Sequence, residues 1–358
     1  MFRSISNLYE IILIIIMKDL FDYCDFGNLK LNSRVVRTGL WESERESAGN
    51  LTPEIYTRYE NIAASGVGLI ITELFTFVAR DAYSKYALTT NYTRFVREAK
   101  DLTDMVHIYG VPIFAQLGSI ECNKRTEQNV SVNDLSVEDI RKIQTDFIIA
   151  AEKMDFAGFD GIQIAMGNSF FFSRFINPSV NKREDKYGGN TLNRLRMILE
   201  IINVLKKNTR LHINCRINAF DGQKMTVDEA VEIAKLLEKH GADSLQITCP
   251  HSQYVLTRGS DEEIPLVQAA DRIIKEVDIP VIYGGGLNSQ NRINELLNQT
   301  DIDFVSMQRP FIADPTFLVE WQVNGNGESF CQTCHNCYAK KTSTCHLKPC
   351  SPEYYKKS

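Results

Sequence analysis

Short apolar runs recur along the chain, and most are followed by a segment with helical periodicity. Strands buried in a parallel sheet form such runs, because helices cover both faces of the sheet. Eight of these units within 358 residues predict an α/β protein built as a (β/α)8 TIM barrel. The predicted strands are residues 35–38, 69–72, 113–117, 161–164, 212–217, 245–248, 281–283 and 304–307. The predicted helices are residues 53–65, 93–109, 137–156, 192–207, 227–240, 265–277, 290–297 and 315–321.

Local signals mark the ends of several predicted helices. Thr52 is a predicted N-cap that places Pro53 in the first turn, where a missing N–H costs nothing. Ser136 and Thr226 each precede an acidic first turn. Glycines favour the left-handed backbone that ends many helices. They stand at four expected helix ends, as Gly66, Gly110, Gly158 and Gly241.

Composition and charge narrow the class of protein. Hydrophobic content of 44% and charged content of 24% are typical of a soluble globular chain. The net charge of -5 does not indicate binding to nucleic acid, which would need an excess of basic residues. The apolar run 11–16 is too short to span a bilayer, so we expect no membrane span. We expect Met17 to be the natural start and residues 1–16 to be an upstream extension; the alternative is a short membrane-touching segment. We therefore expect a cytoplasmic protein whose nine cysteines are mostly reduced.

In a barrel of this kind, functional side chains stand at the carboxyl ends of the strands. The rule selects candidate positions before any ligand is considered. They are residues 38–40, Glu73, Gln116, residues 163–168, Arg216, Cys249, residues 284–286 and residues 308–309.

Three consecutive glycines after the seventh strand suggest a phosphate site. Gly284, Gly285 and Gly286 would let the backbone approach a phosphate, and the helix that follows favours an anion. Arg309 follows the eighth strand, and an arginine binds phosphate through two parallel hydrogen bonds. Phosphate sites after these two strands recur in barrels. The alternative is a glycine turn and a surface arginine.

Two polar residues of the predicted barrel suit an aromatic ring ligand. Gln116 ends the third strand, and a carboxamide can bond the pyrimidine edge of a flavin through both its donor and its acceptor. Arg216 lies in the fifth strand, where its charge would stabilise negative charge on a reduced flavin. The alternative is that Arg216 pairs with a carboxylate inside the barrel.

The most specific segment is residues 158–194, GFDGIQIAMGNSFFFSRFINPSVNKREDKYGGNTLNR. Its blocks are FDG, an amide, Ile, FxxP, NxRxDxYGG and NR. In this order they resemble the old yellow enzyme family of FMN-dependent NAD(P)H oxidoreductases. The resemblance covers about residues 21–321, with supporting blocks at residues 32–37, 41–42, 68–73, 309–310 and 313–315.

The resemblance implies FMN as the cofactor and NADH or NADPH as the electron donor. It implies that Gln116 and Arg216 contact the flavin ring, and that the backbone of Thr38 and Gly39 passes beside that ring. The implied phosphate ligands are Gly285, Gly286 and Arg309.

The chain departs from the family pattern where the acceptor would react. The family places a His on Ala165, a His or Asn on Asn168 and a Tyr on Phe170, so Asn168 is the one catalytic candidate that remains. Loss of an oxyanion donor costs about 10²–10³ in rate, and loss of a general acid about 10²–10⁴. We therefore expect weak reduction of activated alkenes. Other departures are Leu40, Trp41, Ser119, Glu121 and Cys122.

The C-terminal tail is rich in cysteine, with four candidate ligands at Cys331, Cys334, Cys337 and Cys345. Soft thiolates at this density suggest zinc or an iron–sulfur cluster. The resemblance supports a cluster, since related multidomain flavoenzymes carry a 4Fe–4S cluster just after the barrel, with slightly different cysteine spacing. A zinc site, an altered cluster and free thiols remain alternatives.

The sequence as a whole predicts an upstream extension 1–16, an FMN-binding barrel 17–325 and a cysteine-rich tail 326–358. The expected function is transfer of hydride from NAD(P)H through flavin to an unknown small-molecule acceptor in an altered pocket. One alternative is a flavin-binding protein without turnover that acts in binding or regulation. Another is a barrel enzyme without flavin, such as an aldolase, although no lysine ends a predicted core strand. A homo-oligomer is left open.

Overall fold

The computed structural model describes residues 17–39, 49–78, 88–119, 131–168, 170–221, 225–249 and 264–332, with Cys334, Cys337 and Cys345. A nine-stranded parallel sheet closes into a barrel because β3 pairs with both β4 and β11, while β5 pairs only with β4 outside the ring. The predicted (β/α)8 barrel is therefore confirmed. Its strands in chain order are β3 (Val35–Arg37), β4 (Leu69–Thr76), β6 (Ile113–Gly118), β7 (Gly161–Met166), β8 (His212–Asn218), β9 (Ser244–Thr248), β10 (Val281–Tyr283) and β11 (Phe304–Met307), and β5 is Leu88–Thr89.

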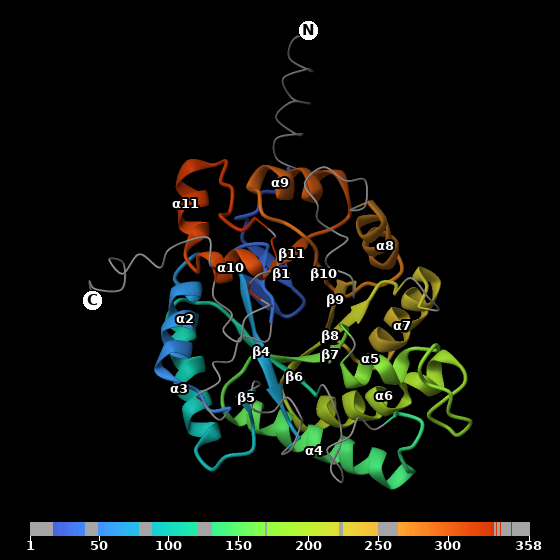
Figure 1. Ribbon diagram of the computed structural model, residues 1–358. Coiled ribbons are helices and arrows are strands. Elements are labelled where there is room, and N and C mark those ends of the chain that lie inside the picture. The colour runs from blue at the N-terminus through green and yellow to red at the C-terminus, as the bar shows by residue number, and fades with distance from the viewer. Residues whose placement is uncertain are drawn as a thin grey trace.

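Helices surround the ring of strands on all sides (Figure 1). Each predicted helix is present within a few residues of its expected bounds. These helices are α2 (Pro53–Ala63), α3 (Phe95–His107), α4 (Val137–Phe156), α6 (Thr191–Asn208), α7 (Val227–Lys239), α8 (Ile264–Ile274), α9 (Gln290–Gln299) and α11 (Phe317–Asn324). Two short helices were not predicted, α5 (Phe171–Ile176) and α10 (Arg309–Ala313).

The predicted helix ends are largely confirmed. Ser136 forms a capping box with Asp139, whose N–H donates to the Ser136 hydroxyl over 3.1 Å. The Thr226 hydroxyl likewise caps α7. Thr52 precedes Pro53 as expected, but its hydroxyl makes no cap bond. The four predicted terminal glycines have φ values of +89°, +68°, +83° and +100° at Gly66, Gly110, Gly158 and Gly241, a backbone that suits glycine.

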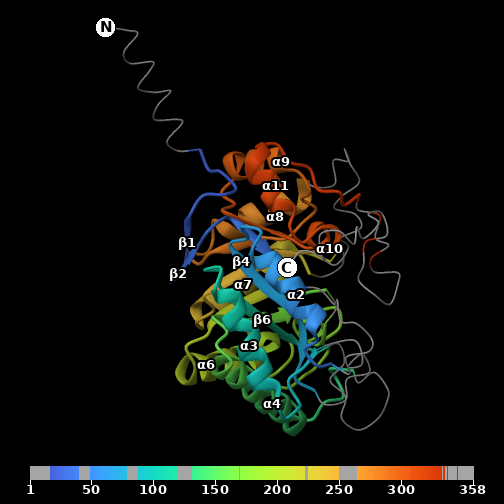
Figure 2. The same ribbon diagram turned by 90° about the vertical axis from the view of Figure 1, so that its left-hand side faces the viewer.

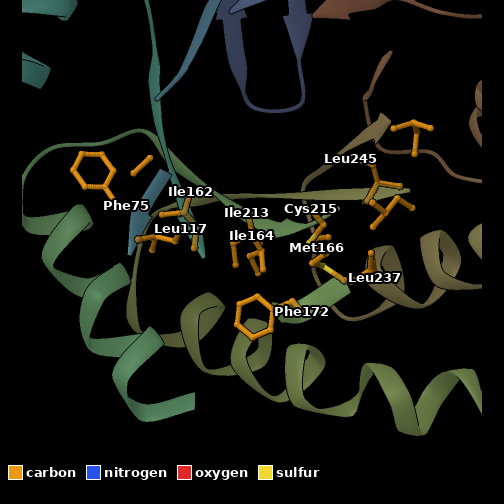
Figure 3. Close-up of a cluster of buried hydrophobic side chains, with 14 of the residues drawn as sticks. Phe75, Leu117, Ile162, Ile164, Met166, Phe172, Ile213, Cys215, Leu237 and Leu245 are labelled. Carbon is orange, nitrogen blue, oxygen red and sulfur yellow. The ribbon is translucent and has the colours of Figure 1, made fainter. Parts of the chain in front are cut away.

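The main hydrophobic core lies between the strands and the helices. Alternate residues of β7 show the arrangement, since Ile162, Ile164 and Met166 project outward from the barrel and are fully buried. Figure 3 shows Ile164 and Met166 near Phe172 of α5, and Ile162 beside Leu117 of β6. The intervening Gln163 points inward and is also fully buried. The interior of the barrel is therefore polar where its outer surface is apolar.

A hairpin closes the amino-terminal end of the barrel. Its strands β1 (Cys24–Phe26) and β2 (Leu29–Leu31) are antiparallel. Phe26 stacks on the His212 ring at 5.2 Å and meets the Phe304 ring edge-on at 4.9 Å, which places it at the first residues of β8 and β11. In Figure 2 the hairpin and α10 lie at opposite ends of the barrel. A ligand site must therefore form at the carboxyl ends of the strands.

Within the described part of the chain, no helix combines the length and the apolar character that crossing a bilayer requires.

Candidate functional site

Three of the predicted ring contacts meet at the carboxyl end of the barrel. The Gln116 carboxamide packs against Gly39, so closely that a Cβ on Gly39 would lie 3.1 Å from its Cδ and Oε1 atoms. The same Cβ would overlap the Thr72 carbonyl, so only glycine fits here. Arg216 donates from its guanidinium to the Gly39 carbonyl over 3.2 Å. An amide, a cation and a stretch of backbone without a side chain are thus brought together.

Beneath this group lies a layer of buried amides that spans the barrel. Gln116 Nε2 donates to Gln163 Oε1 over 2.6 Å, and Gln163 Nε2 donates to Gln246 Oε1 over 2.7 Å. Gln246 Nε2 then donates to the Thr38 hydroxyl over 2.8 Å. Thr38, predicted from its strand end, is therefore connected through two amides to Gln116. Gln246 was not among the predicted residues.

The glycine run and Arg309 follow neighbouring strands, β10 and β11. The Gly284 N–H donates to the Ile247 carbonyl over 2.9 Å, and Gly286 has a φ of +46°. A Cβ on Gly285 would lie 2.9 Å from both Leu266 and the Tyr283 hydroxyl. Arg309 is the first residue of α10. The chain thus makes a tight turn at the glycines after β10, and α10 starts after the neighbouring strand β11. The roles of Gly285, Gly286 and Arg309 as phosphate ligands stay predictions.

The end of β7 carries the catalytic candidate. Asn168 has a φ of +53° and is the one non-glycine residue with positive φ in the described part of the chain. Its N–H donates to Asn218 Oδ1 over 3.1 Å, which holds this left-handed turn in place. Asn218 was not predicted, because the expected strand stopped one residue before it. The catalytic role of Asn168 remains a prediction.

Two residues that depart from the family pattern, Ala165 and Phe170, lie in the described part of the chain. Ala165 is fully buried, and a Cβ on Gly118 would lie 2.8 Å from the Ala165 Cβ. Small residues on β6 and β7 therefore pack directly together where the family has a histidine. Phe170 precedes α5 and makes no side-chain cap bond. Leu40, Trp41, Glu121 and Cys122 lie outside the described residues.

Glu73 ends up away from the barrel mouth, although it was selected by its strand end. A register shift between Ile71 and Leu74 turns this part of β4. The Glu73 N–H donates to the Tyr59 hydroxyl over 2.8 Å, and the Glu73 carboxylate lies 3.7 Å from the Arg58 guanidinium, so Glu73 faces α2. It is a structural residue of the outer layer.

Residues 158–194, here called the signature segment, contain polar side chains that bond to the segment's own backbone and to neighbouring elements. Asn181 donates to the Phe175 carbonyl of α5 and to the Tyr187 carbonyl of its own loop. Arg183 pairs with Asp185 and donates to two carbonyls that precede α4, and the hydrogen bond lowers the Asp185 pKa. Arg194 pairs with Glu229 of α7 and donates to a carbonyl at the end of α5 over 2.8 Å. The motif is therefore a clamp that fixes the loop between β7 and α6.

One tail cysteine, Cys337, lies within electrostatic reach of Arg309. Burial and the nearby Cys331 raise the pKa of the Cys337 thiol to about 11, and the charge of Arg309 lowers it in part. Cys337 therefore lies near both residues. Among the described residues, no group of three or more His, Cys, Asp or Glu side chains is arranged to hold a metal. The metal set Cys331, Cys334, Cys337 and Cys345 stays a prediction.

The fold and the site define a (β/α)8 barrel protein whose ring-binding and phosphate-binding candidates gather at one end. A sequence model of the NADH:flavin oxidoreductase / NADH oxidase family matches residues 19–326. The chain belongs to this family, and the resemblance seen in the signature segment is confirmed.

Individual relatives support the same grouping. The chain is 27% identical to an NADH oxidase of Thermoanaerobacter brockii, over 85% of this chain and 50% of that protein. It is 25% identical to an NADPH dehydrogenase of Bacillus licheniformis, over 83% and 92% of the two chains. The structure of morphinone reductase in complex with tetrahydroNAD superposes with a TM-score of 0.71 at 21% identity, over 87% and 92%. The chain spans about half the length of several relatives that it matches.

Proposed function

We propose that this protein is an FMN-dependent oxidoreductase. The observation that carries the proposal is the meeting of Gln116, Gly39 and Arg216 at the carboxyl end of a barrel of the flavin oxidoreductase family. These residues fit the group, because they offer a carboxamide, a cation and a backbone that a ring can approach closely. FMN, when bound, takes hydride from NADH or NADPH and delivers hydride or electrons to an acceptor.

Each residue has a distinct part in the proposal. Gln116 holds the pyrimidine edge of the ring through its donor and its acceptor. Arg216 stabilises negative charge that develops on the same edge, and its bond to the Gly39 carbonyl fixes its position. Gly285, Gly286 and Arg309 bind the phosphate. Asn168 donates one hydrogen bond to the acceptor.

The acceptor is a small molecule whose pocket differs from the family pattern. With Ala165 buried against Gly118 and Phe170 lacking a hydroxyl, this chain has neither the usual partner of Asn168 nor the usual proton donor. The proposal therefore favours acceptors that need positioning more than protonation. The same observation favours a second candidate, a flavin-binding protein without turnover.

An anaerobic absorbance spectrum of the purified protein, before and after NADH and then NADPH, separates these candidates. A flavin spectrum that bleaches supports the oxidoreductase and identifies its donor. A flavin spectrum that neither nucleotide changes favours the binding protein. Absence of flavin, even after incubation with FMN, would overturn the cofactor assignment.

We also propose that the tail binds zinc or an iron–sulfur cluster. The proposal is supported by the kind of ligand, since zinc and iron–sulfur clusters take thiolates, and by the charges of Cys331 and Cys334, which both act on the Cys337 thiol and raise its pKa. Elemental analysis after anaerobic purification should give about one zinc or roughly four irons per chain. Cys337→Ser should lose the metal and Cys24→Ser, on the hairpin at the other end of the barrel, should keep it. If the parent protein contains no metal, the proposal is wrong and the tail cysteines are free thiols.

The cytoplasmic location, the lack of nucleic-acid and membrane partners, and any homo-oligomer stay predictions.

A further inference from the structure

The buried amides below the site form a chain of hydrogen bonds in which each amide donates to the next polar group. A carboxamide can turn over and exchange its donor with its acceptor, so its partners decide which orientation is stable. The Tyr283 carbonyl is an obligate acceptor, and the Ser306 hydroxyl lies 3.2 Å from it as donor. A hydroxyl has one hydrogen, so Ser306 must accept from Gln246 Nε2, which lies 2.7 Å away.

The orientation of Gln246 then determines the next two amides. With Nε2 on Ser306, Gln246 presents Oε1 to Gln163, which donates from Nε2 over 2.7 Å. Gln163 therefore presents Oε1 to Gln116, which donates from Nε2 over 2.6 Å. The Gln116 Oε1 atom is left on the side of Gly39, where the site lies. A backbone carbonyl across the barrel thus sets the amide at the site.

A second branch from Gln163 runs in the same direction. Its other N–H donates to Asn214 Oδ1 over 2.7 Å, and Asn214 Nδ2 donates to the Ser244 hydroxyl over 2.8 Å. Ser244 lies 2.8 Å from His212 Nε2, and burial lowers the His212 pKa to about 4, so this branch ends on a neutral imidazole. Both N–H groups of Gln163 are engaged, which leaves its oxygen for Gln116.

We propose that Gln163 is a positioning residue that fixes the Gln116 carboxamide with its oxygen toward the site, ready to accept the imide N–H of a flavin. The inference rests on the proposed FMN function. Gln163 itself is fully buried beneath the site and acts only through Gln116. A bond donated into such a chain also polarises the amide and strengthens its acceptor oxygen.

The test is FMN affinity, measured by fluorescence titration of the apoprotein. Gln163→Met keeps the volume and removes every hydrogen bond, so Gln116 is free to turn over. FMN binding should weaken by about 3- to 10-fold, the value of one neutral hydrogen bond. Thr103→Val is the control, because it removes a fully buried hydroxyl that bonds to the Ala157 carbonyl outside this network, and its FMN affinity should not change.

A double-mutant cycle distinguishes positioning from a general loss of structure. In a Gln116→Ala background, Gln163→Met should cause no further loss of FMN affinity. An equal loss in that background, or unchanged affinity in folded Gln163→Met, would overturn the inference while the proposed function stands. A parent protein that binds no FMN would instead overturn the proposed function.

If Gln163→Met does not fold, Ser306→Ala serves as the second variant. It removes the link between Gln246 and the Tyr283 carbonyl and leaves Gln163 in place. FMN binding should weaken by about twofold or more, and only when Gln116 is present. Parent-like affinity in Ser306→Ala would overturn the inference.

Discussion

Arg194→Met tests whether the signature segment is a structural clamp. The Arg194 side chain is 6% exposed and its partner Glu229 is 17% exposed, so the ion pair is largely removed from water. Arg194 also satisfies the Ile176 and Gly189 carbonyls. Methionine keeps most of the volume but leaves a buried carboxylate and two carbonyls without this donor. Breaking one partner of a buried pair costs about 3–5 kcal/mol.

That cost should appear as a lower melting temperature. At about 2 °C per kcal/mol for a chain of this size, the expected decrease is roughly 6–10 °C. Thermal unfolding followed by circular dichroism measures it. Arg94→Met is the control, because Arg94 pairs with Glu98 on the surface at 77% exposure and should change the free energy of unfolding by under about 1 kcal/mol.

A second substitution separates the ion pair from other effects. Replacing Glu229 by leucine in the Arg194→Met background removes the orphaned carboxylate and should recover part of the lost stability. A loss below about 1 kcal/mol in Arg194→Met would refute the clamp. So would loss of FMN binding at an unchanged melting temperature, since it would give the motif a direct role in the site.

Three further changes test other parts of the molecule. Gly39→Ala should lower the free energy of unfolding by about 1–3 kcal/mol and weaken FMN binding, because the methyl overlaps a β4 carbonyl; parent-like titration and melting curves would contradict the close approach. Ala165→His with Phe170→Tyr should raise reduction of a simple cyclic enone by about 10-fold or more, followed by nucleotide consumption; no gain would mean that the pocket serves another acceptor. The hydrogen bond to Asp160 raises the His107 pKa above 6.5, so its stabilisation is complete below that pH and is lost as pH rises through the raised value. His107→Gln should therefore cost more stability in urea unfolding at about pH 6 than at about pH 9, and equal costs would exclude this linkage.

The strands and long helices were predictable because each strand is a buried run, each long helix shows helical periodicity, and several helices have a marked start or end. The two missed helices, α5 and α10, have 6 and 5 residues, too few to show a helical period. Gln246 could have been found, since β9 alternates polar residues inward with apolar residues outward. The orientation of Glu73 could not, because a register shift in β4 leaves no local signal.

The site was predictable as a set of positions and not as a network. The strand-end rule and the resemblance selected Gln116, Gly39 and Arg216, and the structure brings these three together. Neither source indicates that Gln116 is bonded to Gln163, or that the direction of that bond is set at Ser306. Those relations join residues up to 190 positions apart, from 116 to 306, and depend on the register of the closed barrel.

The β1–β2 hairpin gives the molecule a natural handle. It covers the end of the barrel opposite α10, and Tyr23 next to it is 66% exposed. A residue with an azide side chain introduced at position 23 could therefore be coupled to an electrode or a resin without crossing the carboxyl ends of the strands, and without competition from the exposed thiol of Cys334. Proteins attached this way would share one orientation, with the candidate site turned toward the solution. A layer of protein attached through this hairpin would therefore give uniform current or turnover.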